Sequence, residues 1–306
     1  MTFFYLGDES AISLNNLTVT ITGASGFLGT RLQKACEDSN LSYRSVDLRT
    51  QSLPDPVVDG EILVHLAAVA HAASRDERTI ISVNRELAIT TGHHARERGY
   101  RQLVFLSSAL VWGSNYEIVT PNTPEKPDTL YGRCKLQAER GLRDLETSQF
   151  AVTVLRPPLV YGPGVKGNLL RLLHAVHRWP VCPLGVSDNL RTLVHVDNVC
   201  ALILHLARTE TSGVICAVDE TPALSSKELL ERIAQRIPRP ARITGMPQLF
   251  QSALLHLLPD TARRLLGSFV VQDTTARDAG FIAPYSVDHG FDAMVSHYLK
   301  FTPMWE

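Results

Sequence analysis

Long apolar runs and paired cysteines are both missing from this chain. No apolar stretch reaches the roughly 18 residues that a membrane-spanning helix needs. The N-terminal residues show neither a basic leader nor a small-residue cleavage pattern. The five cysteines are far apart and form no Cys-x-x-Cys pair, so neither a disulfide framework nor a zinc site is indicated. We therefore expect a cytoplasmic protein with reduced thiols and no bound metal.

An excess of one charge is also lacking. The formal net charge is −1, whereas a general nucleic-acid or membrane-surface binder usually carries blocks of like charge. We therefore expect no nucleic-acid partner and no membrane partner, and we expect a small ligand instead. With 306 residues, of which 44% are hydrophobic and 20% charged, the chain can form a large core with a smaller lobe attached.

Short apolar runs alternate with amphipathic stretches through the first half of the chain. This alternation predicts an α/β fold with a Rossmann-type, doubly wound parallel sheet. The expected strands are 17–22, 42–47, 61–66, 102–107 and 151–155, and the expected helices are 27–39, 79–98 and 135–145. Prolines and glycines cluster after residue 156, which predicts a smaller, mostly C-terminal lobe.

A glycine-rich turn stands between the first predicted strand and the first predicted helix, in Gly23-Ala24-Ser25-Gly26-Phe27-Leu28-Gly29. In such a turn the first glycine allows a tight bend, and the second lets the backbone approach a pyrophosphate. The third lets the helix pack on the strand. A lone glycine spacing is a weak signal, but this position favours a dinucleotide. We interpret 17–160 as an NAD(P)-binding Rossmann domain, joined again by 192–218, and 161–306 as a discontinuous substrate-binding lobe.

Asp47 ends the second predicted strand. A carboxylate at this place can accept hydrogen bonds from both hydroxyls of the adenine ribose and repel a 2′-phosphate, which favours NAD(H) over NADP(H). Two alternatives stay open: Asp47 as a solvated loop residue, and Arg49 as the partner of a 2′-phosphate.

A phenol and an ammonium group stand on one face of a predicted helix, at Tyr131 and Lys135. The pKa of a free phenol is near 10, and a nearby cation lowers it by favouring the phenolate. Tyr131 would then exchange a proton with an alcohol oxygen while hydride moves at carbon. Lys135 would also hold the nicotinamide ribose, and the Ser108 hydroxyl would hydrogen-bond the same substrate oxygen. A surface Tyr-x-x-x-Lys pair is the common alternative, and the order of the motifs along the chain argues against it.

Three further motifs occur in chain order between Asp47 and Tyr131. They are His65-Leu66-Ala67-Ala68, Asn84, and Ser107-Ser108-Ala109-Leu110-Val111-Trp112-Gly113. With the preceding motifs they make the chain resemble an extended short-chain dehydrogenase/reductase of the NAD-dependent epimerase/dehydratase family. The resemblance implies a homodimer and a catalytic trio of Ser108, Tyr131 and Lys135. It implies cofactor contacts by Gly23, Ser25, Gly26, Phe27, Leu28, Gly29, Asp47, Leu48, Leu66, Ala67, Ala68, Asn84, Ser107, Tyr131, Lys135 and Pro158. Asn84 taken alone fits a helix-packing amide as well.

The segment 155–168 resembles the substrate loop of sugar-nucleotide members, particularly reductases of UDP-linked 4-keto-6-deoxy-N-acetylhexosamines. The implied substrate contacts are Ser108, Trp112, Tyr131, Asn168, Arg191 and Ser268. The fork of Arg191 suits a phosphate, with an Asp188 pair as the alternative. Trp112, where many relatives have Tyr, is expected to reshape the sugar pocket. Many 4-epimerases carry a second phosphate-binding arginine in the C-terminal region. This chain has no clear counterpart of it, although Arg263, Arg264 and Arg277 lie in that part of the sequence.

These motifs predict NAD(P)H-dependent reduction of the C4 keto group of a UDP-linked 6-deoxy-N-acetylhexosamine. The product would be UDP-N-acetylquinovosamine or UDP-N-acetylfucosamine, for the O-antigen of lipopolysaccharide. The alternative is a UDP-hexose 4-epimerase with tightly bound NAD, acting on UDP-glucose or UDP-N-acetylglucosamine. A non-catalytic NAD-sensing protein on the same fold is a third possibility, because fold does not fix function.

Overall fold

Six parallel strands form the central sheet of the computed structural model, which describes residues 17–58, 61–69, 76–219, 222–257 and 266–302. Their order across the sheet is β10–β6–β4–β3–β1–β2. The bounds are β1 Thr18–Thr22, β2 Ser42–Val46, β3 Ile62–His65, β4 Gln102–Leu106, β6 Ala151–Arg156 and β10 Gly213–Cys216. This arrangement confirms the predicted α/β fold with a doubly wound parallel sheet.

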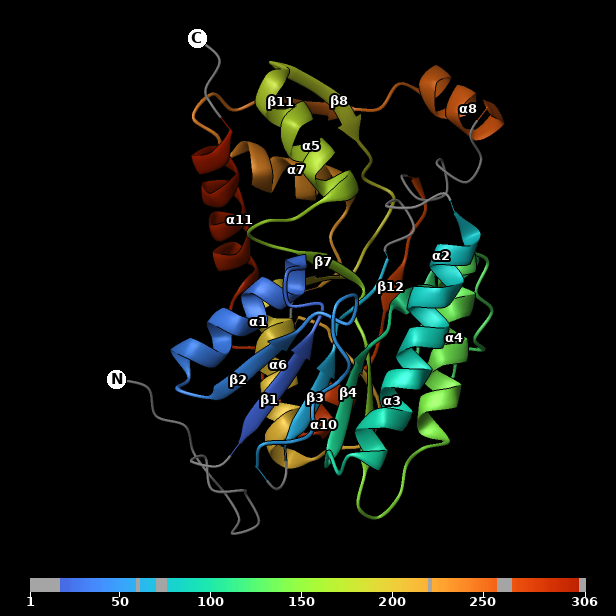
Figure 1. Ribbon diagram of the computed structural model, residues 1–306. Helices are drawn as coiled ribbons and strands as arrows, with labels where there is room; N and C mark the ends of the chain where they lie inside the picture. Colours follow the sequence, from blue (N-terminus) through green and yellow to red (C-terminus); the bar gives the residue numbers. More distant parts are fainter. Residues whose placement is uncertain (1–16, 59–60, 70–75, 220–221, 258–265, 303–306) are drawn as a thin grey trace.

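Helices cover both faces of the sheet (Figure 1). Successive side chains of a strand point to opposite faces, so Val64 packs on one side and Leu63 on the other. The first face is covered by α1 (Phe27–Asp38) and α6 (Val196–Thr209). The second is covered by α3 (Ala88–Glu97) and α4 (Leu130–Arg143). The short helix α2 (Glu77–Ile81) runs through a π-helical turn at Ser82–Leu87 into α3, so the predicted helix 79–98 is continuous but irregular.

Later segments return to the central sheet. Strand β10 pairs with β6, and α6 packs against α1, which places most of 192–218 at the sheet. Helix α10 (Thr275–Asp278) also returns, because Ala276 joins the core under α6 and the Thr275 hydroxyl accepts a hydrogen bond from the Cys216 amide at 2.9 Å. The domain boundaries stay a prediction, but the sequence did not indicate this second return.

The smaller lobe lies beyond the carboxyl ends of the sheet strands (Figure 1). Its helices are α5 (Gly167–Arg178), α7 (Ser226–Ala234), α8 (Gln248–Leu257) and α11 (Val287–Phe301), and its two-stranded parallel sheet pairs β8 (Val181–Gly185) with β11 (Arg242–Gly245). The remaining short elements are two strand pairs and a turn. The first pair is β7 (Leu159–Tyr161) with β9 (Leu193–His195), the second is β5 (Ile118–Val119) with β12 (Val270–Val271), and the 3₁₀ turn is Ala109–Trp112. Ligands of open α/β sheets bind outside these carboxyl ends, so the candidate site lies between sheet and lobe.

Candidate active site

The strand order reverses at β1, whose neighbours β2 and β3 lie on opposite sides, and the glycine turn follows this strand. Gly23 has φ +70°, a left-handed conformation, and a Cβ atom there would lie 2.6 Å from the backbone nitrogen of Ala67. A Cβ atom at Gly29 would lie 2.6 Å from the Cα of Ala24. Both positions therefore need glycine for close backbone packing, as the sequence predicted.

The N-terminus of α1 suits the pyrophosphate of a dinucleotide. Gly26 caps this helix without a side-chain hydrogen bond, and the first turn contains no acidic residue. The first amide groups of a helix attract anions. The side chain of Leu28 is buried in the core, so its predicted cofactor contact would come from the backbone, whereas Ser25 is exposed.

Asn84 secures the segment that follows β3. Its buried side-chain amide donates to the carbonyl oxygens of Val69 (3.0 Å) and Ile80 (2.9 Å), and its oxygen accepts from the Val69 amide (3.1 Å). Both side-chain amide protons are used by the protein, which fits the packing role left open for Asn84, and its contact with a cofactor stays a prediction. Asn84 thereby fixes Val69, directly after Ala67 and Ala68.

Asp47 and Arg49 form one ion pair at the end of β2. The guanidinium donates from Nε to Oδ1 (2.9 Å) and from Nη2 to Oδ2 (2.7 Å), and both side chains are exposed. Hydrogen bonds from Arg49 lower the pKa of Asp47 to about 2. The two alternatives for the ribose site are thus coupled, because the carboxylate that would bind a ribose also restrains the cation that would bind a 2′-phosphate.

Replacing Asp47 with alanine should shift cofactor preference toward NADP(H). The change removes the repulsive carboxylate and releases Arg49, so we expect the ratio of NADP⁺ to NAD⁺ affinity to rise at least about tenfold. Calorimetric titration of both cofactors measures this ratio. Asp38→Ala, which removes an exposed carboxylate of α1 paired with Lys34, is the matched control. An unchanged ratio in Asp47→Ala would contradict a role of this pair in cofactor choice.

The three predicted catalytic residues lie at the start of the 3₁₀ turn and on the first two turns of α4. Ser108 caps the 3₁₀ turn by accepting a hydrogen bond from the Leu110 amide at 3.2 Å, and Thr129 caps α4 by accepting one from the Gly132 amide at 3.0 Å. A Cβ atom at Gly132 would lie 2.6 Å from the carbonyl oxygen of Leu110. This close packing places the first turn of α4, with Tyr131, against the turn that begins at Ser108.

Burial shifts the pKa values of Tyr131 and Lys135 in opposite directions. The Lys135 ammonium is buried, donates to the Leu106 carbonyl oxygen at 2.8 Å and lies 5.9 Å from the centroid of the Tyr131 ring. Desolvation lowers the pKa of Lys135 to about 7 and raises that of Tyr131 to about 12. The expectation that Lys135 lowers the phenol pKa is therefore wrong for the protein's own groups, because the cation is directed at a carbonyl oxygen and burial of the phenol dominates.

A buried ionic network lies directly behind the trio. Glu139, one helical turn after Lys135, accepts hydrogen bonds from the Ser107 hydroxyl and from Arg156 (Nε to Oε1, 3.1 Å). Arg156 also pairs with Glu125, and its guanidinium carbon lies 4.9 Å from the centroid of the Trp112 ring. Glu139 was not among the predicted site residues, although its position continues the Tyr131–Lys135 face of α4 by one more turn.

This network bears on two predicted contacts. The Ser107 hydroxyl donates its proton to Glu139, so the predicted cofactor contact of Ser107, which stays a prediction, would not use that proton. Trp112 is almost fully buried in a core cluster with Val111, Val119 and Leu136. Its large ring fills the space behind the 3₁₀ turn and stacks on Arg156, so Trp112 supports the turn from within instead of lining a sugar pocket.

The predicted phosphate-binding residues fall into two places. Arg191 and Ser268 lie on paired segments: the Arg191 guanidinium donates to the Gly267 carbonyl oxygen (2.8 Å), and the Ser268 hydroxyl accepts from the Leu190 amide (3.1 Å). Burial lowers the pKa of Arg191. Asn168 is exposed in the first turn of α5 and accepts a hydrogen bond from Arg171 at 3.4 Å.

Two further residues that were predicted to contact the cofactor, Pro158 and Leu48, are half-buried.

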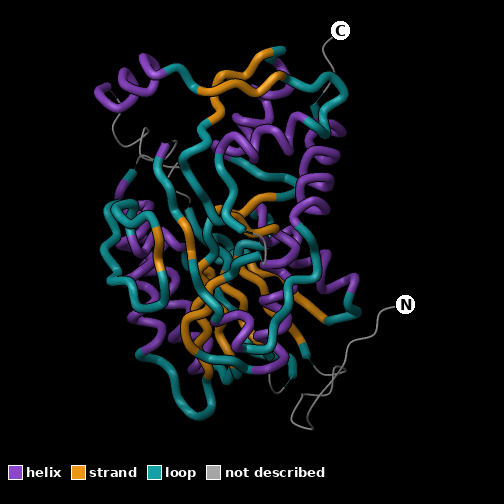
Figure 2. Tube along the Cα trace, turned by 180° about the vertical axis from the view of Figure 1, so that it is seen from behind, coloured by secondary structure: helices purple, strands orange, loops and turns teal. Residues whose placement is uncertain are grey.

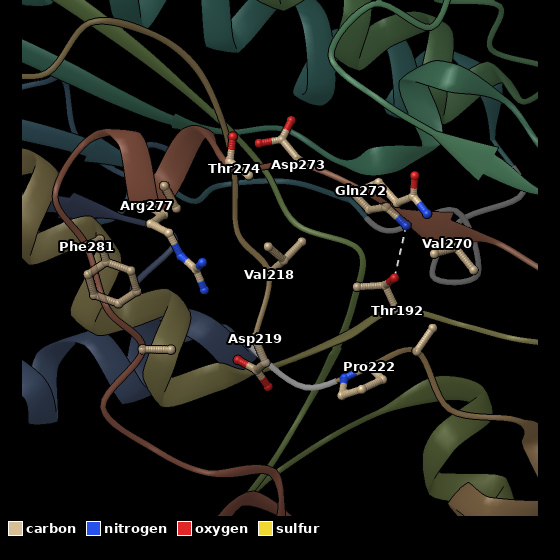
Figure 3. A pocket seen from close by; sticks show the side chains of 14 residues that line it. Thr192, Val218, Asp219, Pro222, Val270, Gln272, Asp273, Thr274, Arg277 and Phe281 are labelled. Atoms are coloured by element: carbon tan, nitrogen blue, oxygen red, sulfur yellow. Dashed lines mark hydrogen bonds between the residues drawn. The ribbon is translucent and has the colours of Figure 1, made fainter.

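A cavity of about 390 Å³ adjoins Thr192, next to Arg191 (Figure 3). Residues 218–219 and 222–223 line one wall and 270–274 and 276–277 the other, and the lining includes Asp219 and Arg277 but no residue of the trio. The Thr192 hydroxyl fixes the second wall by accepting from the Val271 amide at 2.9 Å. Arg277 is thus the one candidate for a second arginine that can be placed, because Arg263 and Arg264 lie outside the described residues.

His195 lies outside the candidate site, and the described residues show neither a metal cluster nor a membrane-spanning helix. His195 is fully buried between Tyr161 and Tyr285, and burial lowers its pKa to about 4. Among the described residues, no cluster of three or more His, Cys, Asp or Glu side chains is arranged to hold a metal ion. None of the helices in the same ranges combines the length and the apolar character needed to span a bilayer.

Known proteins share this architecture. The profile described as "NAD dependent epimerase/dehydratase family" matches residues 19–216. The UDP-glucose 4-epimerase of Vibrio cholerae is 25% identical, over 92% of this chain and 96% of its own length. The N-acetyl-alpha-D-glucosaminyl-diphospho-ditrans,octacis-undecaprenol 4-epimerase of Escherichia coli O157:H7 is 24% identical, over 92% and 95%. The solved structure of MoeE5 in complex with UDP-glucose and NAD has the same fold, with a TM-score of 0.72, 20% identity and coverage of 92% of this chain and 99% of its own.

Proposed function

Because the chain belongs to the NAD dependent epimerase/dehydratase family, we propose that it moves hydride to and from C4 of a sugar carried on UDP, with NAD(H) as its cofactor. The observation that carries this proposal is the packing of the Tyr131 turn on the Ser108 turn, at the same sheet edge as the glycine turn. A dinucleotide bound at α1 would reach from the glycine turn toward Lys135 along this edge.

Each residue of the trio has a separate task in this reaction. Tyr131, whose pKa is about 12, holds its proton at neutral pH and donates it to the C4 oxygen when a keto sugar is reduced. Ser108 offers its hydroxyl to the same oxygen. Lys135 would bind the nicotinamide ribose through its buried amino group. A bound oxidised nicotinamide supplies the hydride acceptor and a positive charge that favours the Tyr131 phenolate during oxidation.

We place the 4-epimerase ahead of the 4-ketoreductase that the sequence analysis favoured. Two relatives that each cover 92% of the chain are named 4-epimerases, and both names include a diphosphate-linked sugar or a UDP-sugar, whereas a relative that is 22% identical over 90% of the chain is named a ketoreductase. A diphosphate is the group that Arg191 and Asn168 are expected to bind. The ketoreductase stays the second candidate, supported by the resemblance of segment 155–168 to reductases of 4-keto sugars.

Cofactor consumption distinguishes the two candidates. The purified enzyme is denatured, and the released NAD(H) is quantified; a second sample is incubated with UDP-glucose or UDP-N-acetylglucosamine without added cofactor. We expect near-stoichiometric NAD and formation of the C4 epimer. Stoichiometric oxidation of NAD(P)H with a UDP-4-keto-6-deoxy-N-acetylhexosamine would identify the ketoreductase instead. Turnover in neither assay would contradict the proposed function.

A further inference from the structure

Leu110 is the exposed side chain of the turn that begins at Ser108. The 3₁₀ turn Ala109–Trp112 buries its other three side chains, whereas Leu110 is 39% exposed. The turn follows β4, so it lies at the carboxyl edge of the sheet, and in both views the smaller lobe stands beyond this edge (Figures 1 and 2). Leu110 is therefore the apolar side chain of this turn that is open to a bound molecule.

Two backbone contacts fix Leu110 beside the trio. Its amide donates to the Ser108 hydroxyl at 3.2 Å, and its carbonyl oxygen would lie 2.6 Å from a Cβ atom at Gly132, next to Tyr131. The Cβ atom of a residue lies about 2.5 Å from its own nitrogen, so the Leu110 side chain begins within roughly 6 Å of the Ser108 oxygen. The methyl groups of Leu110 thus reach atoms that neighbour any oxygen held by Ser108.

We propose that Leu110 selects sugars that carry a methyl group, instead of a hydroxymethyl group, on the carbon next to C4. This inference rests on the proposed function, in which Ser108 and Tyr131 hold the C4 oxygen. The ring carbons beside C4 are C3, with its hydroxyl, and C5, which carries C6. A C6 hydroxyl placed against Leu110 would lose water without gaining a partner, whereas burial of a C6 methyl group is favourable.

The same contact serves an epimerase that acts on two C4 epimers. The keto sugar must present both of its faces to one nicotinamide, so C3 and C5 exchange places relative to Leu110 when the sugar turns over. C6 therefore meets Leu110 in one of the two orientations, and the C3 hydroxyl, which the sugars compared below share, meets it in the other. The pair that this selection favours is UDP-N-acetylquinovosamine and UDP-N-acetylfucosamine, which differ only at C4.

Two matched substrates test the inference. With NAD⁺ present, kcat and KM are measured for UDP-N-acetylglucosamine and for UDP-N-acetylquinovosamine, which lacks only the C6 hydroxyl; formation of the C4 epimer or of NADH is followed. We expect kcat/KM to favour the 6-deoxy sugar at least about tenfold, as an apolar pocket discriminates against an added hydroxyl.

Replacing Leu110 with asparagine should remove this preference. Leu110→Asn keeps the size of the side chain but offers an amide to the C6 hydroxyl, so the ratio of the two kcat/KM values should fall to about threefold or less. The contact is present in the bound substrate as well as in the transition state. The change should therefore appear in KM, with kcat within about threefold of the parent value.

Two control variants separate selection from a general effect. Leu110→Met keeps an apolar side chain of similar volume, so it should keep the preference. Val57→Asn makes the polar change at a residue that is 65% exposed and whose amide donates to Glu61, directly before β3 at the amino edge of the sheet; it should leave both substrates unaffected. Circular dichroism and the content of bound NAD verify that each variant is folded.

The outcomes distinguish this inference from the proposed function. Turnover of both sugars with kcat/KM values within about threefold of each other would overturn the inference and leave the proposed function intact. An unchanged preference in Leu110→Asn, or an equal change in Val57→Asn, would do the same. Turnover of neither sugar would overturn both.

Discussion

Tyr131→Phe is expected to lower kcat at least about a hundredfold while leaving cofactor affinity within about twofold. Loss of a positioned general acid–base typically costs 10²–10⁴ in rate. The phenol has no neighbouring substitute, because the Lys135 ammonium is held by the Leu106 carbonyl oxygen and the Ser108 hydroxyl is too weakly acidic to replace it. The measurement is steady-state turnover of the UDP-sugar together with titration of NAD⁺.

A second phenol provides the control for this variant. Tyr43→Phe removes a hydroxyl that donates to Glu37 on the surface of β2 and α1, and it should keep turnover within about twofold. If Tyr131→Phe retained more than about a tenth of the parent kcat, the proton would come from another group, and the assignment of the trio would be wrong.

Glu139→Gln is expected to destabilise the protein by about 3–5 kcal/mol, the usual cost of leaving one partner of a buried ion pair without its counter-charge. Glu139 is fully buried, and Arg156 is nearly so. The variant keeps the shape of the side chain but leaves the Arg156 cation with Glu125 alone. Because Ser107 loses a charged acceptor next to Ser108, kcat should fall as well. Urea unfolding gives the change in the free energy of unfolding.

Glu125→Gln is the matched control, because it removes the other carboxylate of Arg156 at a position that is 24% exposed. Solvent partly replaces that carboxylate, so we expect a loss of about 1 kcal/mol or less. Equal losses in the two variants would show that burial of Glu139 does not determine the strength of the network.

Local patterns were sufficient to predict the sheet, the glycine turn and the shared helix face of Tyr131 and Lys135. Buried parallel strands such as Ile62–His65 are apolar along their whole length, and a tight strand–helix turn requires glycine at positions 23 and 29 whatever the rest of the sequence contains. Tyr131 and Lys135 share a helix face by spacing alone. These features depend on neighbours in sequence, which is why the sequence shows them.

The sequence does not show contacts that depend on distant partners. Trp112 is near the trio in sequence, but its ring packs on Arg156, 44 positions later. The Ser107 hydroxyl is taken by Glu139, and the Asn84 amide by the backbone of Val69. The pKa of Tyr131 rises because burial, which the sequence does not show, outweighs a cation that points elsewhere.

The path of the hydrogen at C4 tests the central claim most directly. The enzyme is incubated with UDP-glucose or UDP-N-acetylglucosamine that carries deuterium at C4, and the product is analysed by mass spectrometry and NMR. Direct hydride transfer through a retained cofactor predicts a C4 epimer that keeps the deuterium at C4. An epimer that has lost the deuterium to solvent would show proton abstraction from carbon, and it would contradict the account.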